Sequence, residues 1–457
     1  MIKNKTNYRG ILFFLLSLLL ALLITWWVKE PAFTQAQTYV LFLLLFSVFL
    51  WLTEAVPPFA VGLFIMAYLA FTLGYERITN SPVDIAIYTG TFSSSVIWLT
   101  LGGFFLASAL SKTRLDRDLI HFTLRACGRN PRWILLSLML VTMVFSMLIS
   151  NTATTAMVIA AVMPLLLKTG KQSPVSKGLV LGIPIAATVG GMGTIIGSPP
   201  NAIAVGALAS AGHPMQFATW LLYGIPLAVL LTFVSWWVLV RIFMKKGEEL
   251  AMEGPGQEES GSPVNLQRDR WIVIAVLAVT LLLWLTSPLH GLSAAAVSAI
   301  PLVVLPLTGI LKGEDIRAVG WDTLLLIAGG LSLGLALKET GLLDLYAGRI
   351  ATLKVSPVVF LFLLAYATMI FSNIMSNTAT STVLIPLGMT ILPAHAVEVC
   401  MIIGLSASTA LFLPVSTPPN AIAYSTGMIR QKDFRTGGAL IGLLGPALIV
   451  LWVLLIT

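Results

Sequence analysis

The chain has 457 residues, of which 57% are apolar and 10% are charged, and its mean hydropathy is +0.94. These values exclude an ordinary soluble protein, and uncharged runs of roughly 20 residues, each long enough to cross a bilayer, recur along it. The net charge of +8 does not indicate a nucleic-acid partner, because most Lys and Arg residues lie between the apolar runs, where they set membrane topology. We therefore predict an all-α polytopic membrane protein with about 11 transmembrane helices.

The first apolar run, from Ile11 to Val28, follows three basic residues and could be mistaken for a signal peptide. No small-residue cleavage pattern follows it, and Trp26-Trp27 instead mark the end of a span at the membrane interface. We expect residues 1–35 to form one retained N-terminal transmembrane helix, with the span at 10–28 and the basic N-terminus in the cytoplasm.

Residues 36–246 are predicted to form the first of two repeated halves. Five spans are expected in it. The first lies at 36–56, the second follows and ends near Gly74, the third follows the stretch 75–95 and ends near Ser111, and the last two lie at 179–210 and 220–243. The polar stretch 75–95 is expected to be a loop. Residues 112–132 carry Arg114, Arg117, Arg125 and Arg129 among apolar residues, which predicts an amphipathic helix along the membrane interface.

An uncharged stretch at residues 133–167 is too long for one span and too short for two spans with a loop. Both of its ends are flanked by basic residues, which mark the cytoplasmic side. We therefore predict a re-entrant helical hairpin with its tip at residues 150–152. Unpaired backbone at such a tip is tolerated only where protein or a water-filled cavity surrounds it.

Two polar motifs each occur twice. Residues 150–154 and 376–380 both read SNTAT, and SPPNAIA at 198–204 is matched by TPPNAIA at 417–423. Each motif interrupts an apolar run, and the second motif breaks the spans at 179–210 and 396–428. Two matched breaks per half indicate an internal duplication whose breaks form one central site.

The second half is predicted at residues 271–457, after an acidic cytoplasmic linker at 247–270. Its spans are expected at 271–288, 291–311, 322–337, 396–428 and the C-terminal run, with a second re-entrant hairpin at 355–394 and a second interfacial helix at 338–354. Each half has five crossings, so the second enters the membrane upside down. The halves form an inverted repeat, and the hairpin tips meet near the midplane.

The breaks favour an anion site. Ser, Asn and Thr cap helix N-termini, and the prolines suit the start of the second half of a broken helix. Four such N-termini facing one cavity would hold an anion without any Lys or Arg. Carbonyls freed at the breaks, together with Ser and Asn oxygens, are ligands that Na⁺ accepts.

The paired SNT motifs, the LTEAVP stretch at 52–57 and LPVSTPPNAI at 413–422 resemble the divalent anion/sodium symporter family. The resemblance covers nearly the whole chain after the first span. It implies a homodimer whose protomers each have a scaffold domain and an elevator-like transport domain. It assigns substrate binding to ten residues: Ser150, Asn151, Thr152, Ser198, Pro199, Ser376, Asn377, Thr378, Thr417 and Pro418. It places one sodium ion by Ser146, Ser150, Asn151 and Gly197, and a second by Ser372, Met375, Asn377 and Ser416.

Together these features predict sodium-coupled uptake of C4-dicarboxylates such as succinate, malate and fumarate across a bacterial inner membrane. The alternatives with the same fold are a sodium-independent dicarboxylate or citrate exchanger and a sulfate symporter. An intramembrane enzyme is disfavoured because no histidine or acidic pair accompanies the motifs. A channel is disfavoured because a pore needs no opposed hairpins. The two cysteines and four histidines lack metal-ligand spacing, and we expect no covalently bound cofactor.

Overall fold

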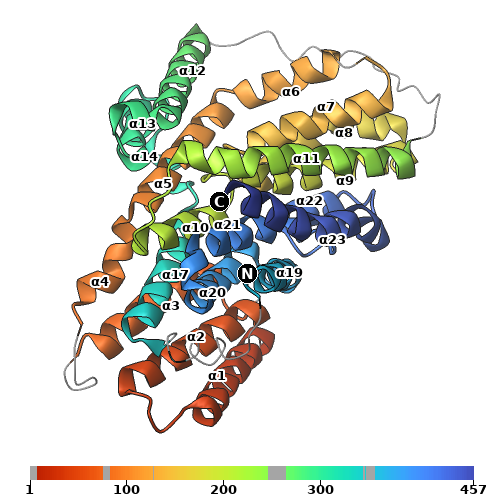
Figure 1. Ribbon diagram of the computed structural model, residues 1–457. Helices are drawn as coiled ribbons and strands as arrows, with labels where there is room; N and C mark the ends of the chain where they lie inside the picture. Colours follow the sequence, from red (N-terminus) through yellow and green to blue (C-terminus); the bar gives the residue numbers. More distant parts are fainter. Residues whose placement is uncertain (1–7, 76–82, 127, 245–263, 343–344, 346–355) are drawn as a thin grey trace.

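The structure is a computed structural model that describes residues 8–75, 83–126, 128–244, 264–342, 345 and 356–457. All regular elements in these residues are helices, as the sequence predicts (Figure 1). Nine of the described helical segments are long and apolar enough to cross a membrane. They are Arg9–Val28, Gln35–Thr53, Ile85–Lys112, Asn151–Thr169, Pro174–Gly193, Phe217–Phe243, Trp321–Glu339, Pro357–Ile374 and Gln431–Ile456.

One layer of the molecule is built from α1 (Tyr8–Val28), α2 (Gln35–Thr53), α3 (Pro58–Leu73) and α17 (Trp321–Glu339), which pack in that order (Figure 1). The closest approach is between Gly62 of α3 and Gly329 of α17. A Cβ atom on Gly329 would lie 2.3 Å from the Gly62 Cα, so no side chain fits between these backbones. The small residues therefore lock α17 against the N-terminal helices.

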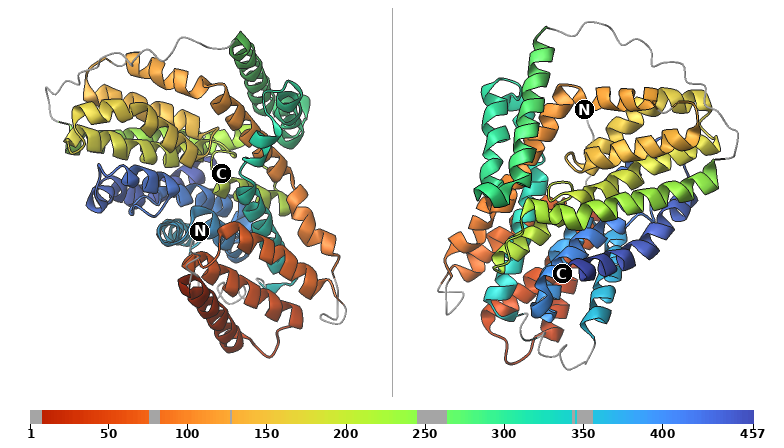
Figure 2. Two further views of the ribbon diagram at one scale, coloured as in Figure 1. Left: turned by 180° about the vertical axis from the view of Figure 1, so that it is seen from behind. Right: turned by 45° about the horizontal axis from the view of Figure 1, so that its top comes forward.

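A long helix, α5 (Ser95–Lys112), crosses the molecule and connects this layer with the other helices (Figures 1 and 2). It is preceded by α4 (Ile85–Thr89) and η1 (Gly90–Ser93), so the predicted loop at 75–95 is wrong from Ile85 onward. The Asp84 carboxylate caps α4 by accepting a 2.9 Å hydrogen bond from the Ala86 N–H. The polar capping residue contributed to the polar composition of this stretch, and that composition predicted a loop.

Four helices of the second half pack on or near α5. They are α12 (Val264–Leu285), α13 (Ser287–His290), α14 (Ala294–Val297) and α15 (Ala299–Leu307). The start of α12 shows that the predicted linker at 247–270 ends earlier, because residues from Val264 are helical. The charged residues at 268–270 are typical of a solvent-exposed linker, but in the structure they belong to α12. The Arg270 side chain donates to the Thr113 carbonyl at 3.0 Å and forms a salt bridge with Asp118 at 2.8 Å. The apolar stretch at 291–311 is divided into short helices rather than one span.

The predicted interfacial helix at 112–132 corresponds to α6 (Leu115–Ala126), which packs on α7 (Pro131–Ser146). Ile120 is fully buried on its inner face, whereas Leu119 and Phe122 are exposed. A salt bridge between Lys112 and Asp315 ties the end of α5 to α16 (Gly313–Arg317), just before α17. Burial raises the pKa of Asp315, but the hydrogen bond and charge of Lys112 outweigh it and hold that pKa below its usual range. Most of the second predicted interfacial helix, at 338–354, lies outside the described residues.

Both uncharged stretches form pairs of helices joined by short turns. The first pair is α7 (Pro131–Ser146) and α8 (Asn151–Thr169), and the second is α19 (Pro357–Ile374) and α20 (Asn377–Ile391). Ser150 and Ser376 are the N-caps of the second helix in each pair. Their hydroxyls accept hydrogen bonds from the N–H groups three residues later, at 3.3 Å and 3.1 Å respectively. The Ser-Asn-Thr motif is therefore the start of a helix in both copies.

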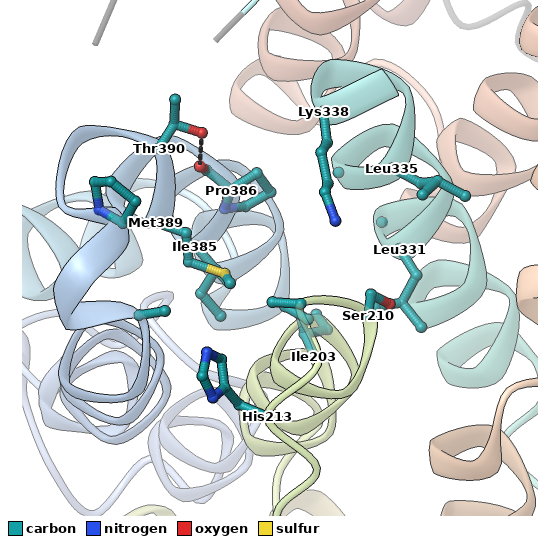
Figure 3. A pocket seen from close by; sticks show the side chains of 16 residues that line it. Ile203, Ser210, His213, Leu331, Leu335, Lys338, Ile385, Pro386, Met389 and Thr390 are labelled. Carbon is teal, nitrogen blue, oxygen red and sulfur yellow. Dashed lines mark hydrogen bonds between the residues drawn. The ribbon is translucent and has the colours of Figure 1, made fainter. Parts of the chain in front are cut away.

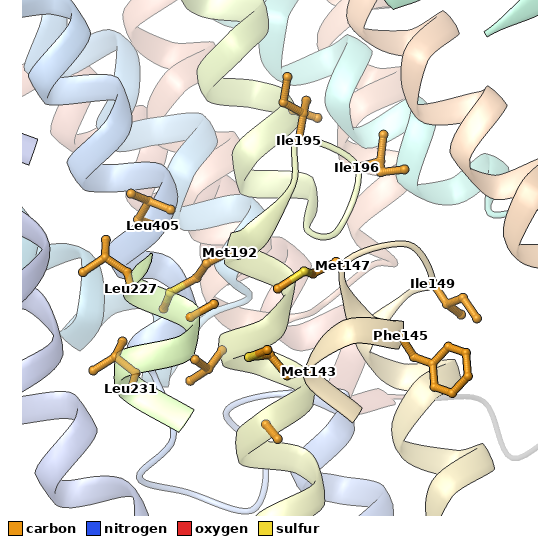
Figure 4. Close-up of a cluster of buried hydrophobic side chains, with 14 of the residues drawn as sticks. Met143, Phe145, Met147, Ile149, Met192, Ile195, Ile196, Leu227, Leu231 and Leu405 are labelled. Atoms are coloured by element: carbon orange, nitrogen blue, oxygen red, sulfur yellow. The ribbon is translucent and has the colours of Figure 1, made fainter. Parts of the chain in front are cut away.

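The two broken spans follow the helix pairs. The first consists of α9 (Pro174–Gly190), η2 (Gly191–Gly193) and α10 (Pro199–Ser210), and the second of α21 (Ala396–Ser406), η4 (Ala407–Thr409) and α22 (Pro418–Ser425). The long helices α11 (Phe217–Phe243) and α23 (Gln431–Ile456) pack against each other and close the bundle. Met147 of the α7–α8 turn packs on the first broken span, where a Cβ atom on Gly193 would lie 2.7 Å from the Met147 methyl carbon (Figure 4). Apolar packing thus joins the first turn to the span that follows.

Candidate functional site

A cavity of about 300 Å³ lies where four helices begin. It is lined by the first residues of α8, α10, α20 and α22 on one side and by α5 and α17 on the other. The lining residues are Thr100, Phe104, Ser150, Asn151, Thr152, Ile196, Gly197, Ser198, Pro199, Pro200, Asp322, Thr323, Ser376, Asn377, Thr378, Ser416, Thr417, Pro418 and Pro419. Its volume is at the small end of the range for ligand pockets, about 300–1,000 Å³.

The four helix starts contribute unequally to the cavity. The first two residues of α8 and of α20 carry N–H groups that have no acceptor within their own helix. In α10 and α22 both first positions are prolines, at 199–200 and 418–419, which have no N–H. All four helices place a partial positive charge at the cavity, but only α8 and α20 also supply backbone donors there.

The opposite side of the cavity was not foreseen from the sequence. It consists of Thr100 and Phe104 on α5 and Asp322 and Thr323 at the start of α17. Asp322 is exposed and is the one charged side chain among the residues that line the cavity. In the sequence, the acidic residue in the first turn of an apolar run indicates only a helix start. No repeated motif marks these four residues, so their position depends on how α5 and α17 pack.

In the first half, Asn201 holds the loop between η2 and α10. It is fully buried, and its amide nitrogen donates to the carbonyls of Gly191, at 2.8 Å, and Thr194, at 2.7 Å. The Thr194 hydroxyl in turn donates to the Met147 carbonyl in the α7–α8 turn. These bonds connect the repeated PPNAIA motif to the neighbouring turn and fix the loop that ends at Gly197.

Three oxygens converge on the side-chain amide of Asn151. The Asn151 amide nitrogen donates to the Ser146 Oγ at 2.6 Å and to the carbonyl oxygens of Ala187 and Gly197, at 3.2 Å each. The loop approaches closely because it carries glycine: a Cβ atom on Gly191 would lie 2.6 Å from the Asn151 side-chain amide. Hydroxyl, amide and carbonyl oxygens of this kind are the ligands that alkali cations accept.

The second half fixes its loop in a different way. The Asn373 Oδ1 accepts hydrogen bonds from the Phe412 N–H at 3.0 Å and from the Ser416 hydroxyl at 2.8 Å. Asn420 donates one further bond, to the Leu413 carbonyl at 3.0 Å. The position that matches Asn373 in the first copy is Met147, so a search for repeated polar residues misses Asn373. The two halves share the backbone breaks and the bond from the motif asparagine to the loop carbonyl seven residues earlier, at Thr194 and Leu413. The other bonds that hold the two loops differ.

Several buried oxygens in the second half have no hydrogen-bond partner among the described residues. They include the hydroxyls of Ser372 and Thr380 and the Oδ1 of Asn377. A buried polar atom without a partner costs about 1–3 kcal/mol, so such a group is usually satisfied by water, an ion or a ligand. The donor set of this region, which consists of neutral oxygens, fits a monovalent cation.

The structure brings the predicted site residues together. All ten residues assigned to the substrate line the cavity, as do Gly197 and Ser416 from the sodium sets. The remaining three, Ser146, Ser372 and Met375, are buried and do not line it. The structure thus separates a cavity wall from a set of polar groups behind that wall.

An all-helical chain with nine apolar helices among its described residues and a polar cavity at its helix starts is an integral membrane transporter. A family model described as citrate transporter matches residues 48–399, and the chain belongs to this family. This confirms the family resemblance to divalent anion/sodium symporters that the motifs carry.

Several proteins are similar to the chain over most of its length. The sodium-dependent dicarboxylate transporter SdcS of Staphylococcus saprophyticus is 29% identical, over 97% of this chain and 89% of that protein. An uncharacterized transporter of Haemophilus influenzae is 32% identical, over 96% and 95%. The sodium-dependent high-affinity dicarboxylate transporter 3 of Caenorhabditis elegans is 29% identical, over 86% and 78%.

Two solved structures share the fold. The YdaH transporter of Alcanivorax borkumensis aligns with a TM-score of 0.54 and 12% identity, over 87% of this chain and 98% of that chain. The Neisseria gonorrhoeae MtrF structure aligns with a TM-score of 0.51 and 12% identity, over 86% and 94%. At this identity the likeness concerns the fold alone.

Proposed function

We propose that the protein is a secondary active transporter that takes up C4-dicarboxylates such as succinate, malate and fumarate together with sodium ions. The observation that carries the proposal is the meeting of four helix starts at one cavity whose lining includes neither Lys nor Arg among the described residues. Each N-terminus is equivalent to about half an elementary positive charge, so four sum to roughly +2. Together with the single negative charge of Asp322, the site carries roughly +1, which favours a small anion.

In this proposal the backbone N–H groups at the starts of α8 and α20 bind the two carboxylates. Asn151 and Asn377 lie at these starts, with Thr152 and Thr378 next to them. The hydroxyls of the Ser150 and Ser376 caps already accept helix bonds, so these residues mainly hold the turns in place. The names of the relatives, two of which are sodium-dependent dicarboxylate transporters, support this substrate class.

Sodium ions are the coupling substrate. The oxygens around the Asn151 amide, from Ser146, Ala187 and Gly197, support one cation position. The unpartnered oxygens of Ser372 and Asn377 support a second. Met375 lies between them in the chain, and Ser416 is held near them by its hydrogen bond to Asn373. A cation behind either turn adds positive charge beside a helix start that faces the cavity. Binding of the cation and of the dianion would therefore favour each other.

Movement and assembly follow the same proposal. The matched breaks support two inverted repeats, at 36–246 and 271–457, and about 11 crossings with two re-entrant hairpins. The tight α3–α17 packing supports a fixed scaffold, against which the domain with α7–α11 and α19–α23 moves as an elevator. We further propose a homodimer in a bacterial inner membrane with a cytoplasmic N-terminus, which agrees with the basic residues between spans.

The test is uptake of labelled succinate into proteoliposomes with and without an inward sodium gradient. Uptake that requires external sodium and saturates with succinate is the expected result. Uptake that ignores sodium but requires an internal dicarboxylate or citrate would instead identify an exchanger, which is the alternative with the same fold. Sodium-dependent uptake of labelled sulfate without uptake of labelled succinate would identify a sulfate symporter.

A further inference from the structure

A second cavity, of about 430 Å³, lies between α10, α17 and α20 (Figure 3). The same three helices line the candidate substrate cavity, but with their first residues, whereas this one is lined by their later residues. Ser210 lies roughly 16 Å along α10 from Pro199, at 1.5 Å per residue. The two cavities are therefore at opposite ends of one three-helix interface.

The walls of this cavity are mostly apolar. Ile203, Leu331, Ile385 and Met389 point into it, and the Ile385 and Leu331 side chains are buried (Figure 3). Its hydroxyl groups are already used within their own helices. Thr390, for example, donates to the Pro386 carbonyl at 2.9 Å. The cavity thus offers an apolar body of ligand size and few polar groups for orientation, the usual composition of a small-molecule site.

Two polar side chains reach the cavity, and neither has a hydrogen-bond or ion-pair partner among the described residues. The Lys338 side chain extends from the end of α17 toward the cavity, and His213 approaches from the opposite side (Figure 3). No acidic side chain is among the residues that line the cavity, so its charge complement is a cationic group over an apolar chamber. This composition selects against a small dicarboxylate, which would have to leave water for apolar walls.

We propose that this cavity binds one alkyl chain of an anionic amphiphile, with its carboxylate or phosphate head at Lys338 and that chain along the apolar walls. A free fatty acid and an acidic membrane lipid share this chemistry. His213 would supply a second hydrogen bond to the head. Lys side chains at helix ends near a membrane surface commonly keep the ammonium in the polar zone, which is where such a head lies.

The bound alkyl chain would contact both α17 and α20, which pack closely against each other beside the cavity. Next to the cavity, a Cβ atom on Gly330 of α17 would lie 2.7 Å from the Thr382 side chain of α20, and one on Gly334 would lie 3.2 Å from Pro386. An occupant that contacts both α17 and α20 resists sliding between them. The effect on transport rests on the proposed function, whereas the binding itself does not. Occupancy should lower the maximal uptake rate without changing half-saturation for the substrate.

The test uses the purified full chain in phosphatidylcholine nanodiscs, with radiolabelled palmitate as the probe and uncharged hexadecanol as the comparison. Palmitate should bind saturably and hexadecanol at least about tenfold more weakly, because it lacks the charge. Lys338→Gln should weaken palmitate binding about tenfold, the range of one charge-assisted hydrogen bond. Lys171→Gln, at an exposed loop lysine, is the matched control and should leave binding unchanged.

A cavity-filling variant, Ala207→Phe, should abolish palmitate binding while thermal unfolding without palmitate stays cooperative. Nanodiscs with phosphatidylglycerol distinguish the sources: loss of palmitate binding there assigns the site to an acidic lipid, and retention assigns it to a free fatty acid. Equal binding of palmitate and hexadecanol, or equal binding by Lys338→Gln and wild type, overturns the proposal. Palmitate that binds but leaves the uptake rate unchanged overturns the bridging effect. A protein that fails to transport succinate yet binds palmitate overturns only the proposed function.

Discussion

Replacing Asn201 by alanine is the sharpest test of how the first broken span is held. The side chain is fully buried, and its amide donates to two loop carbonyls, those of Gly191 and Thr194. Asn201→Ala leaves both carbonyls without a donor, and each unpaired buried group costs about 1–3 kcal/mol. The Oδ1 of Asn201 has no partner among the described residues, so its removal returns part of that cost.

The net cost should therefore be about 2 kcal/mol, carried mainly by the loop rather than by the whole fold. Because Gly197 O belongs to this loop and faces Asn151, the loss should appear as weaker sodium activation. A change of 2 kcal/mol corresponds to roughly a 30-fold rise in the sodium concentration for half-maximal uptake. The assay is succinate uptake in proteoliposomes over a series of sodium concentrations.

The second half provides a matched comparison. Asn420 occupies the equivalent position but donates only one described bond, to the Leu413 carbonyl. Asn420→Ala should therefore shift sodium activation several-fold less than Asn201→Ala. Thr169→Val, which removes a partly buried hydroxyl at the far end of α8, should leave sodium activation unchanged. Equal shifts in the two asparagine variants, or none in Asn201→Ala, would refute the reasoning.

Four further changes test other parts of the site. Asn377→Ala should abolish uptake while the protein still purifies folded, and normal rates would contradict the turn assignment. Thr378→Val should change the order in which succinate, citrate and sulfate compete with labelled succinate; an unchanged order would argue against contact. Asp322→Asn should lower the succinate half-saturation about fivefold, because a carboxylate in the lining of the same cavity repels a dianion by roughly 1 kcal/mol after screening; a rise would contradict this. Gly329→Ala should destabilise the protein by about 1–3 kcal/mol in thermal unfolding, whereas Gly313→Ala, whose Cβ meets nothing within 4 Å, should not.

The helix pairs and broken spans could be predicted because they depend on local properties of the chain. Ser150 and Ser376 cap helices with their own hydroxyls, and paired prolines begin helices wherever they stand. An uncharged run interrupted by such residues therefore indicates a break before any packing is known. The ten substrate-site candidates are assigned by the family resemblance rather than by these rules, and all of them lie at these breaks and line one cavity.

The other wall could not be predicted from these rules. Phe104 reaches the cavity because α5 packs beside the start of α17, where a Cβ atom on Gly320 would lie 3.2 Å from the Phe104 ring. Asn373 was missed because its role depends on a bond to Phe412, a contact between distant segments. Neither position is repeated in the other half. Local chemistry thus predicts where the chain breaks, and packing decides what faces each break.

The paired prolines at the starts of α10 and α22 give the cavity two kinds of end. The N-termini of α10 and α22 attract an anion only through their partial positive charge, which has no preferred direction. Those of α8 and α20 also bind it through directional N–H hydrogen bonds. A dicarboxylate bound only through its two carboxylates can vary in the carbon chain between them. Four-carbon dicarboxylates that differ by a double bond or one hydroxyl in the middle should therefore be transported at similar rates. Dicarboxylates with a shorter or longer carbon chain should be excluded.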